Sequence, residues 1–337
     1  MPLLSLADTA VIGQLGKAGP IGAVAIGGVI LSSSYWIFGF LRMGTCGLVA
    51  QARGARDLTE TSAILVRGVL IAALAGLGFG WGVADLGIAT LVAEWSGLGL
   101  GLWLCRGAFA GGQWHDWSRI LQAGRLGRMA AVNGDIMIRT TLLTFSFTAL
   151  TFFGAAFGDV TLDANQILLQ FLAVFAYALD GFAFAAESLV GQAVGAGSRA
   201  SRRKGAVMTS IWGAAFVLLL AMSFLAFGPA AIRFITPAIA VREAAAHYLP
   251  WMVIAPFVGL ACWMLDGIFI GATRTRDMRN GAIIAMAIFA AALWMLGAIW
   301  GNHGIWAALM LSYIARAVTL WLHYPKLEAS ADRQPAL

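Results

Sequence analysis

Two acidic residues, Asp180 and Glu187, stand seven residues apart in one long apolar stretch. Seven residues make two turns of an α-helix, so the two carboxyl groups share a face. Tyr177 lies close to the same stripe and is a candidate for the substrate path. Inside a bilayer an ionised side chain costs about 2.5–3.5 kcal/mol, which makes it a candidate functional group unless it has a structural partner. We expect Glu187 to bind a proton or a cation, or to be a buried structural acid. Asp180 is expected either to take part in ion or proton coupling or to join two helices.

Three more polar residues in apolar surroundings are candidates. Asn165 and Gln166 offer uncharged contacts to a substrate, or a cap at the outer end of their helix. Asp266 follows a stretch interrupted by Pro250 and Pro256, and it lies about two turns before a basic loop. We expect Asp266 either to take part in ion or proton coupling or to pair with a cytoplasmic arginine.

Two arginines in the apolar stretches, Arg42 and Arg139, are candidates for the substrate path. Asp135 and Arg139 have the i, i+4 spacing of an ion pair on one helix. Arg42 could pair with Glu94 elsewhere in the same half of the chain.

The composition identifies the surroundings of these residues as a membrane. Of the 337 residues 60% are hydrophobic and 11% are charged, whereas a soluble domain has about 25% charged residues. The apolar stretches are long enough to cross a hydrocarbon layer of about 30 Å. We predict an all-α, polytopic membrane protein with about ten transmembrane helices, at residues 2–16, 22–52, 61–80, 83–105, 130–157, 162–196, 204–227, 243–272, 279–300 and 304–323.

The positive charges lie on alternate loops. Fifteen lysines and arginines fall on one set of loops and the tail, and three fall on the opposite set. By the positive-inside rule the first set is cytoplasmic, so we expect a multi-pass protein of the plasma (inner) membrane with a cytoplasmic C-terminus. The net charge of +6 therefore reflects topology rather than a nucleic-acid partner.

Enzyme and metal motifs are missing from the sequence. The four histidines form no H-E-x-x-H, the three cysteines are dispersed, and no G-x-S-x-G or clustered pair of aspartates occurs. We expect neither an intramembrane enzyme nor a metal or organic cofactor. The predicted partners are the lipid bilayer and a small amphipathic substrate, and no oligomer is required.

The chain contains an internal repeat. The segment LVAQARGA at Leu48 to Ala55 returns 141 residues later as LVGQAVGA at Leu189 to Ala196. The repeat relates an even number of predicted spans, so the two halves are parallel and related by an axis along the membrane normal. We predict a reduced N-lobe at residues 1–112, an amphipathic cytoplasmic linker at 113–129, a six-helix C-lobe at 130–325 and a tail at 326–337.

Four stretches carry a family resemblance: PLLSLADTAVIGQLG from Pro2, GTCGLVAQARGARD from Gly44, LDANQILLQFLAVFAYALDGFAFAAESLVGQAVGAG from Leu162, and LDGIFIGATRTRDMRN from Leu265. Together they resemble the multidrug and toxic compound extrusion (MATE) family, most closely its DinF-like branch. The matching motif residues, for which a structural role is implied, are Gln51, Gly54, Gln192, Gly195, Gly267 and Gly271.

The resemblance implies a twelve-helix exporter in two six-helix lobes, which moves organic cations or other amphipathic compounds outward against protons or sodium. It also implies that Asp8, in a D-x-A-V-x-G-x-L pattern, is the proton-responsive acid of the N-lobe. This chain departs from the family plan, because four spans rather than six precede the second copy of the motif and the first span is half length. Two alternatives therefore stay open: a shortened family member that does not transport, and a flippase for lipid-linked precursors.

Overall fold

Helices make up the part of the chain that the computed structural model describes, which is residues 39–40, 42–79, 103, 106 and 116–330. Within these residues there is no strand, and the all-α prediction is confirmed. A helix over residues 42–54 is followed by α3 (Leu58–Phe79), α6 (Trp117–Ile120), α7 (Ala123–Ala155), α8 (Asp159–Gly195), α9 (Arg199–Ile235), α10 (Ile239–Tyr248), α11 (Pro250–Gly271), α12 (Thr275–Trp300) and α13 (Asn302–Ser330). Asp8 and Glu94, with the spans predicted around them, lie outside the described residues.

Among the residues that the structure describes, six helical segments are long and apolar enough to cross a membrane: α7, α8, α9, α10 with α11, α12 and α13. These are the six spans predicted for the C-lobe, but most of them extend beyond the predicted ends. The span predicted at 204–227 is the 37-residue helix α9, and α7 begins at Ala123, inside the predicted linker. Hydropathy detects only the apolar part of a helix, whereas capped polar turns can continue the same helix beyond the hydrocarbon layer.

Pro250 marks the interruption predicted in the fourth of these spans. Because proline has no backbone N–H and favours the first helical turn, the chain divides there into α10 and α11, with Pro250 at the start of α11. Pro256 does not interrupt the helix, since α11 continues past it to Gly271.

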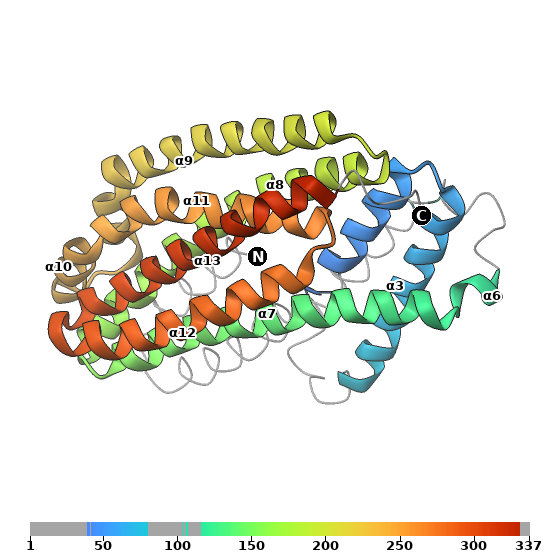
Figure 1. Ribbon diagram of the computed structural model, residues 1–337. Helices are drawn as coiled ribbons and strands as arrows, with labels where there is room; N and C mark the ends of the chain where they lie inside the picture. The colour runs from blue at the N-terminus through green and yellow to red at the C-terminus, as the bar shows by residue number, and fades with distance from the viewer. Residues whose placement is uncertain (1–38, 41, 80–102, 104–105, 107–115, 331–337) are drawn as a thin grey trace.

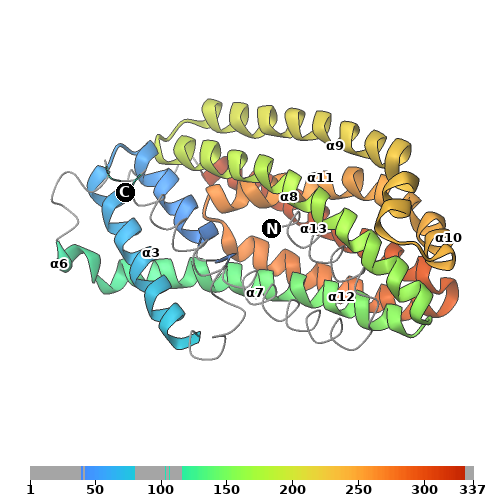
Figure 2. The ribbon, with the colours of Figure 1, turned by 180° about the vertical axis from the view of Figure 1, so that it is seen from behind.

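Helix α11 lies at the centre of the bundle formed by α7 to α13 (Figures 1 and 2). It packs against α8, α9 and α13, while α7 packs against α12. The core between these helices contains fully buried aromatic side chains, among them Phe175, Phe289 and Trp306. This packing brings the polar residues of α7, α8, α11 and α13 toward one another.

The internal repeat is visible in the backbone. At equivalent positions, Arg56 and Gly197 adopt left-handed conformations (φ 60° and 65°) that end the helix of residues 42–54 and α8. The next residues, Asp57 and Ser198, accept hydrogen bonds from the backbone N–H three positions on, at 2.8 and 3.3 Å, and so cap α3 and α9. Both turns therefore have the same construction, 141 residues apart.

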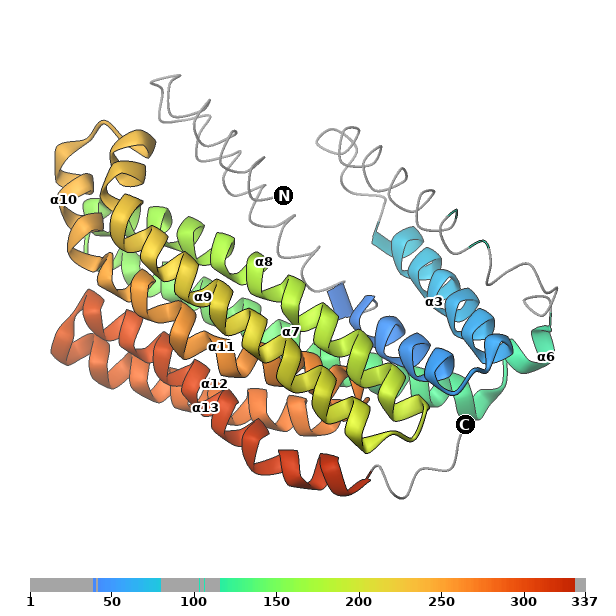
Figure 3. The ribbon, with the colours of Figure 1, turned by 90° about the horizontal axis from the view of Figure 1, so that it is seen from above.

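The two copies of the repeated motif also contact each other (Figure 3). A Cβ atom at Gly54 would collide with the backbone of Gln192, and one at Gly195 would collide with the backbone of Gln51. The contact is reciprocal because each glycine of one copy faces the glutamine of the other. Residues without a side chain are needed here because they allow two helices to approach closely.

Charged residues hold α3 against the segment around α6. Arg67, a charge that the sequence places within a span, donates to the carbonyl oxygen of Ile120 at 2.7 Å and to Glu60 at 3.0 Å. Arg119 and Arg125 also pair with Glu60. Ile120 is fully buried, so this part of the predicted linker is anchored to α3 by charge pairs and an apolar contact.

Candidate functional site

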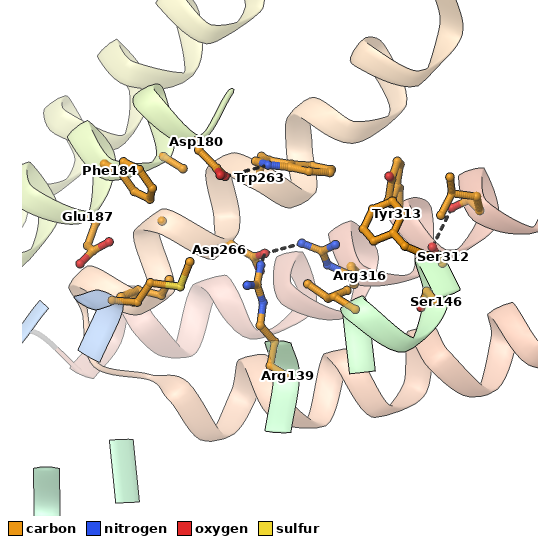
Figure 4. Close-up of a pocket in the computed structure, with 17 residues that line it drawn as sticks. Arg139, Ser146, Asp180, Phe184, Glu187, Trp263, Asp266, Ser312, Tyr313 and Arg316 are labelled. Carbon is orange, nitrogen blue, oxygen red and sulfur yellow. Dashed lines mark hydrogen bonds and ion pairs between the residues drawn. The ribbon is translucent and has the colours of Figure 1, made fainter. Parts of the chain in front are cut away.

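A cavity lined by both polar and apolar residues lies between α7, α8, α11 and α13 (Figure 4). Its enclosed volume is about 50 Å³, enough for a few water molecules or one small polar group. Four helices supply the lining, and Met43 adds a contact from the helix of residues 42–54. The polar lining residues are Arg139, Ser146, Asp180, Glu187, Asp266, Ser312, Tyr313 and Arg316.

Asp266 lies between two arginines in this cavity. Oδ2 of Asp266 accepts hydrogen bonds from Arg139 of α7 and Arg316 of α13, and all three residues are less than 9% exposed. Asp266 therefore pairs with arginines, but the prediction that its partner is a cytoplasmic arginine is wrong. Both partners belong to membrane-spanning helices. Two guanidinium groups on one carboxylate leave little room for a bound cation at Asp266.

The predicted ion pair between Asp135 and Arg139 is also wrong. Asp135 accepts hydrogen bonds from Arg279 at 2.7 Å and from the Thr275 hydroxyl at 3.0 Å, both on α12. Arg139 turns instead toward Asp266 of α11. The partners of Asp135 and Arg139 lie on neighbouring helices and not on α7 itself. The spacing of residues along one helix cannot reveal such partners.

Asp180 joins two helices, as predicted. Its Oδ1 atom accepts a hydrogen bond from the Trp263 indole of α11 at 3.1 Å. The Trp263 ring contacts Tyr313 edge to face, at 5.2 Å between ring centroids, and lies 5.4 Å from the Arg316 guanidinium carbon. The acid on α8 is thus connected through one indole ring to the charged residue of α13.

Glu187 differs from the other acids of the cavity. Its side chain is 2% exposed, and its Oε1 atom has no hydrogen-bond partner among the described residues. Arg42 lies nearby, with its guanidinium carbon 3.8 Å from the centre of the Phe184 ring, one turn before Glu187 on α8. An ionised carboxylate with an unpartnered oxygen is costly in such a place, whereas a protonated carboxyl group costs far less.

The predicted uncharged substrate contacts do not line the cavity. Asn165 is fully buried and exchanges two hydrogen bonds with Asn302, at 2.7 and 2.9 Å, and its Oδ1 atom also accepts from the Trp306 indole. It is therefore neither a helix cap nor open to a substrate. Gln166 is exposed, and Tyr177, 39% exposed, is not among the lining residues.

The motif residues bring the cavity-lining helices together. Cβ atoms at Gly267 and Gly271 of α11 would collide with the backbone of α8 at Ala183 and Glu187. Gln51 donates to the carbonyl oxygen of Gly271 at 2.9 Å. These contacts support the structural role predicted for the motif, because they fix α11 against α8 and the helix of residues 42–54.

Three residues that line the cavity were not predicted from the sequence: Trp263, Tyr313 and Arg316. Arg316 carried a usable signal, since it is an arginine in an apolar span, as Arg139 is. Tyr313 and Trp263 carried none, because aromatic residues in membrane helices are usually packing residues.

A cavity lined by ionisable residues between membrane-spanning helices is typical of membrane transporters. The MatE family model matches residues 1–83 and 136–296. The chain belongs to the MatE family, and we describe it from here as a MATE-type efflux transporter and a multi-pass membrane protein.

A curated relative supports the DinF-like assignment. The chain is 31% identical to DNA damage-inducible protein F of Escherichia coli, in a match that covers 95% of this chain and 87% of the relative. The match runs over 407 residues, more than the 337 of this chain. The relative therefore has residues within the matched region that have no counterpart here.

Solved structures show the same fold. A mutant of the Vibrio cholerae MATE transporter VcmN matches with a TM-score of 0.76 at 17% identity, covering 98% of this chain and 93% of that chain. The eukaryotic MATE transporter AtDTX14 matches with a TM-score of 0.75 at 16% identity, covering 98% and 94%. A MOP superfamily transporter of Pyrococcus furiosus matches with a TM-score of 0.81 at 11% identity, covering 99% and 93%.

Proposed function

We propose that this transporter exports amphipathic organic cations in exchange for protons, and that Glu187 is the proton-binding acid of the C-lobe. The observation that carries the proposal is the buried Glu187 carboxyl group with its unpartnered oxygen. Such a group can hold either a proton or the positive charge of a substrate, but not both. Competition of this kind is what an antiporter needs, because release of one ligand must accompany binding of the other.

The geometry favours protons over sodium in the described part of the chain. A hard cation such as sodium needs several oxygen ligands, whereas a proton needs one. Asp266 is already bonded to two guanidinium groups, and Asp180 accepts from Trp263. We keep Asp8 as the proposed acid of the N-lobe, on the strength of its sequence pattern.

The orientation proposed for the protein is that of an exporter in the plasma membrane, with its tail in the cytoplasm. The distribution of lysines and arginines over the loops supports it. Two basic turns that are equivalent in the repeat both lie on the predicted cytoplasmic side. One contains Arg53 and Arg56, and the other contains the basic residues from Arg199 to Lys204.

A flippase for lipid-linked precursors is the second candidate. It is favoured by Arg139 and Arg316, which together offer two guanidinium groups to a diphosphate. Both arginines already share Asp266, however, and the α8 side of the cavity carries Asp180 and Glu187. The mixed charge of the cavity therefore fits an amphipathic small molecule better than a diphosphate.

Transport into reconstituted vesicles tests the proposal. We expect an imposed proton gradient, with the membrane potential clamped, to drive uptake of the permanently charged cation tetraphenylphosphonium, and a sodium gradient to drive none. Glu187→Gln should reduce the proton-driven rate by at least about tenfold. The matched control is Glu243→Gln, which removes an exposed acid of α10 that does not line the cavity.

Two results would contradict the proposal. Uptake driven by a sodium gradient alone would show that the coupling ion is sodium and not the proton. Absence of uptake by the folded, vesicle-inserted wild-type chain would instead support the shortened, non-transporting alternative.

A further inference from the structure

A groove lies on the outside of the bundle, between α9, α11 and α13. Helices α9 and α13 both pack against α11, which lies between them (Figure 1). The groove has a volume of about 700 Å³, within the range of about 300–1,000 Å³ that is usual for ligand sites. It shares no lining residue with the cavity of Figure 4. Its apolar lining includes Val207, Ile211, Phe257, Met264, Leu265 and Ile268.

The groove has the length of one leaflet of a bilayer. Its lining runs from Arg203 to Ala214 on α9 and from Phe257 to Ile268 on α11. On each helix these ends are eleven residues apart, which at 1.5 Å per residue is about 17 Å. Half of a hydrocarbon layer of about 30 Å is about 15 Å. The groove can therefore hold one acyl chain of a lipid along its length.

One end of the groove has the residues that are typical of a membrane–water interface. Trp321 and Tyr324 of α13 line this end, and their rings stack with 5.9 Å between centroids. Tryptophan and tyrosine are enriched at the level of the lipid headgroups. Arg202 of α9 donates to the carbonyl oxygens of Leu327 and Glu328 at 3.1 and 2.8 Å, so the start of α9 and the end of α13 meet here.

The same end of the groove carries an excess of positive charge. Arg203 lines the groove, and Lys204 lines an adjoining hollow to which Arg203 also contributes. Both side chains are exposed, and within the described part of the chain neither makes an ion pair. Glu328, the acid in the lining, pairs with Arg199 at 3.5 Å. The charges of Arg203 and Lys204 are therefore available to an anion.

A phosphate group fits these two residues. A guanidinium group can donate two parallel hydrogen bonds to phosphate oxygens, and a lysine ammonium binds phosphate as a point charge. The Tyr324 hydroxyl group, at the same end of the groove, can donate another hydrogen bond. The cytoplasmic leaflet, on which the positive-inside rule places these residues, contains lipids with a negatively charged headgroup.

We propose that this groove binds an anionic phospholipid. The phosphate binds at Arg203 and Lys204, and one acyl chain lies in the groove between α9, α11 and α13. The charged end and the apolar length of the groove match the two parts of one lipid molecule. The proposal does not depend on proton exchange at Glu187, because the groove and the cavity have no lining residue in common.

Native mass spectrometry of the delipidated, full-length protein in a non-ionic detergent tests the proposal. Two lipids with the same chains are titrated: dioleoylphosphatidylglycerol, which is anionic, and dioleoylphosphatidylcholine, which has no net charge. The third probe is glycerophosphoglycerol, the anionic headgroup without acyl chains. We expect the first phosphatidylglycerol to bind at least about tenfold more tightly than phosphatidylcholine, and the headgroup alone to show no binding at the same concentrations.

A charge variant tests the phosphate site. Arg203→Gln combined with Lys204→Gln should weaken phosphatidylglycerol binding at least about tenfold, to the level of phosphatidylcholine. The protein should remain folded, because both side chains are exposed. The matched control is Arg53→Gln combined with Arg276→Gln, which removes the same charge from two exposed positions that do not line the groove.

A second variant tests the acyl-chain site. Ala214 lines the groove and its neighbour Ala215 does not, although both are exposed on α9. Ala214→Phe places a ring in the groove, so it should weaken the binding of both lipids several-fold. Ala215→Phe is the matched control and should bind both lipids as the wild type does.

Four results would overturn the proposal. Equal affinity of the wild type for the two lipids would show that the headgroup charge is not recognised. An equal effect of either variant and its control would show that the groove is not the site. Binding of glycerophosphoglycerol as tight as that of the lipid would show a site for free phosphate esters. A wild-type dimer that Ala214→Phe dissociates would show that a second copy of the chain occupies the groove.

Discussion

Asn165 shows how a buried polar residue of a membrane helix can be satisfied without a substrate. Its side-chain amide exchanges two hydrogen bonds with Asn302 at the start of α13, and its oxygen accepts a third from the Trp306 indole at 3.0 Å. All three residues are less than 5% exposed. These hydrogen bonds, which we call the Asn165 cluster, connect the start of α8 to the start of α13. They lie at the opposite end of α8 from the Gly197 turn.

We predict that Asn165→Ala destabilises the C-lobe by about 1–3 kcal/mol, because it leaves the Asn302 amide and the Trp306 indole without their partner. The measurement is thermal or denaturant unfolding of the purified protein in detergent. Gln166→Ala, at the exposed neighbouring position, should leave stability unchanged. A loss of substrate affinity at unchanged stability would contradict this structural role. It would support the prediction from the sequence that Asn165 contacts the substrate.

The spacing of Asp180 and Glu187 correctly predicts that both side chains reach one cavity. Their partners could not be predicted, since Trp263 lies 83 residues after Asp180 and belongs to another helix. The same limit explains the error at Asp135 and Arg139, where helical spacing permits an ion pair but α11 and α12 provide better placed partners. The spacing of residues along a helix predicts which of them share a face. Which residues of other helices contact that face depends on the tertiary packing.

At the scale of the helices, the repeated motif acts as a contact surface. Gly54 and Gly195 each lie against the backbone of the other copy, and a Cβ atom at Gly191 would contact the Ala50 side chain. Because the copies are related by the repeat, one small-residue pattern serves both sides of the contact. This explains why the glycines recur 141 residues apart while many residues around them do not.

We predict that Gly195→Val separates the helix of residues 42–54 from α8, because the new side chain would meet the backbone at Gln51 and Ala55. The expected result is a large loss of folded, monodisperse protein on size-exclusion chromatography. Gly181→Val is the control, since Gly181 is on the same helix and a Cβ there meets no atom within 4 Å. Equal behaviour of the two variants would show that the reciprocal contact is not needed for assembly.

Composition and hydropathy were sufficient to predict the existence and order of α7 to α13. The ends of the helices were less predictable, because Ser198 and Asp57 cap helices that start in polar sequence. The division at Pro250 was predictable from the chemistry of proline, whereas the continuity of α11 through Pro256 was not.

At the scale of the whole molecule, the described residues contain six helices long and apolar enough to cross a membrane, all between Ala123 and Ala329. The alignment with the Escherichia coli relative is longer than the chain itself, so the relative has residues in the matched region that this chain lacks. The described part of the N-terminal half is nevertheless well connected, through Gln51 to α11 and through Glu60 and Arg67 to the segment around α6. The cavity that contains Glu187 is lined by α7, α8, α11 and α13, with Met43 as the contact from the helix of residues 42–54.

The most direct test of the account is to measure the protons released when a substrate cation binds. Tetraphenylphosphonium carries a permanent charge and no proton, so any proton that appears in a weakly buffered solution of the purified transporter comes from the protein. We predict the release of about one proton per bound cation, and an affinity that rises with pH as fewer protons compete. Glu187→Gln should bind with little pH dependence and release no proton, while Glu243→Gln should behave as the wild type does. Binding without proton release in the wild type, or unchanged release in Glu187→Gln, would contradict the assignment of proton exchange to Glu187.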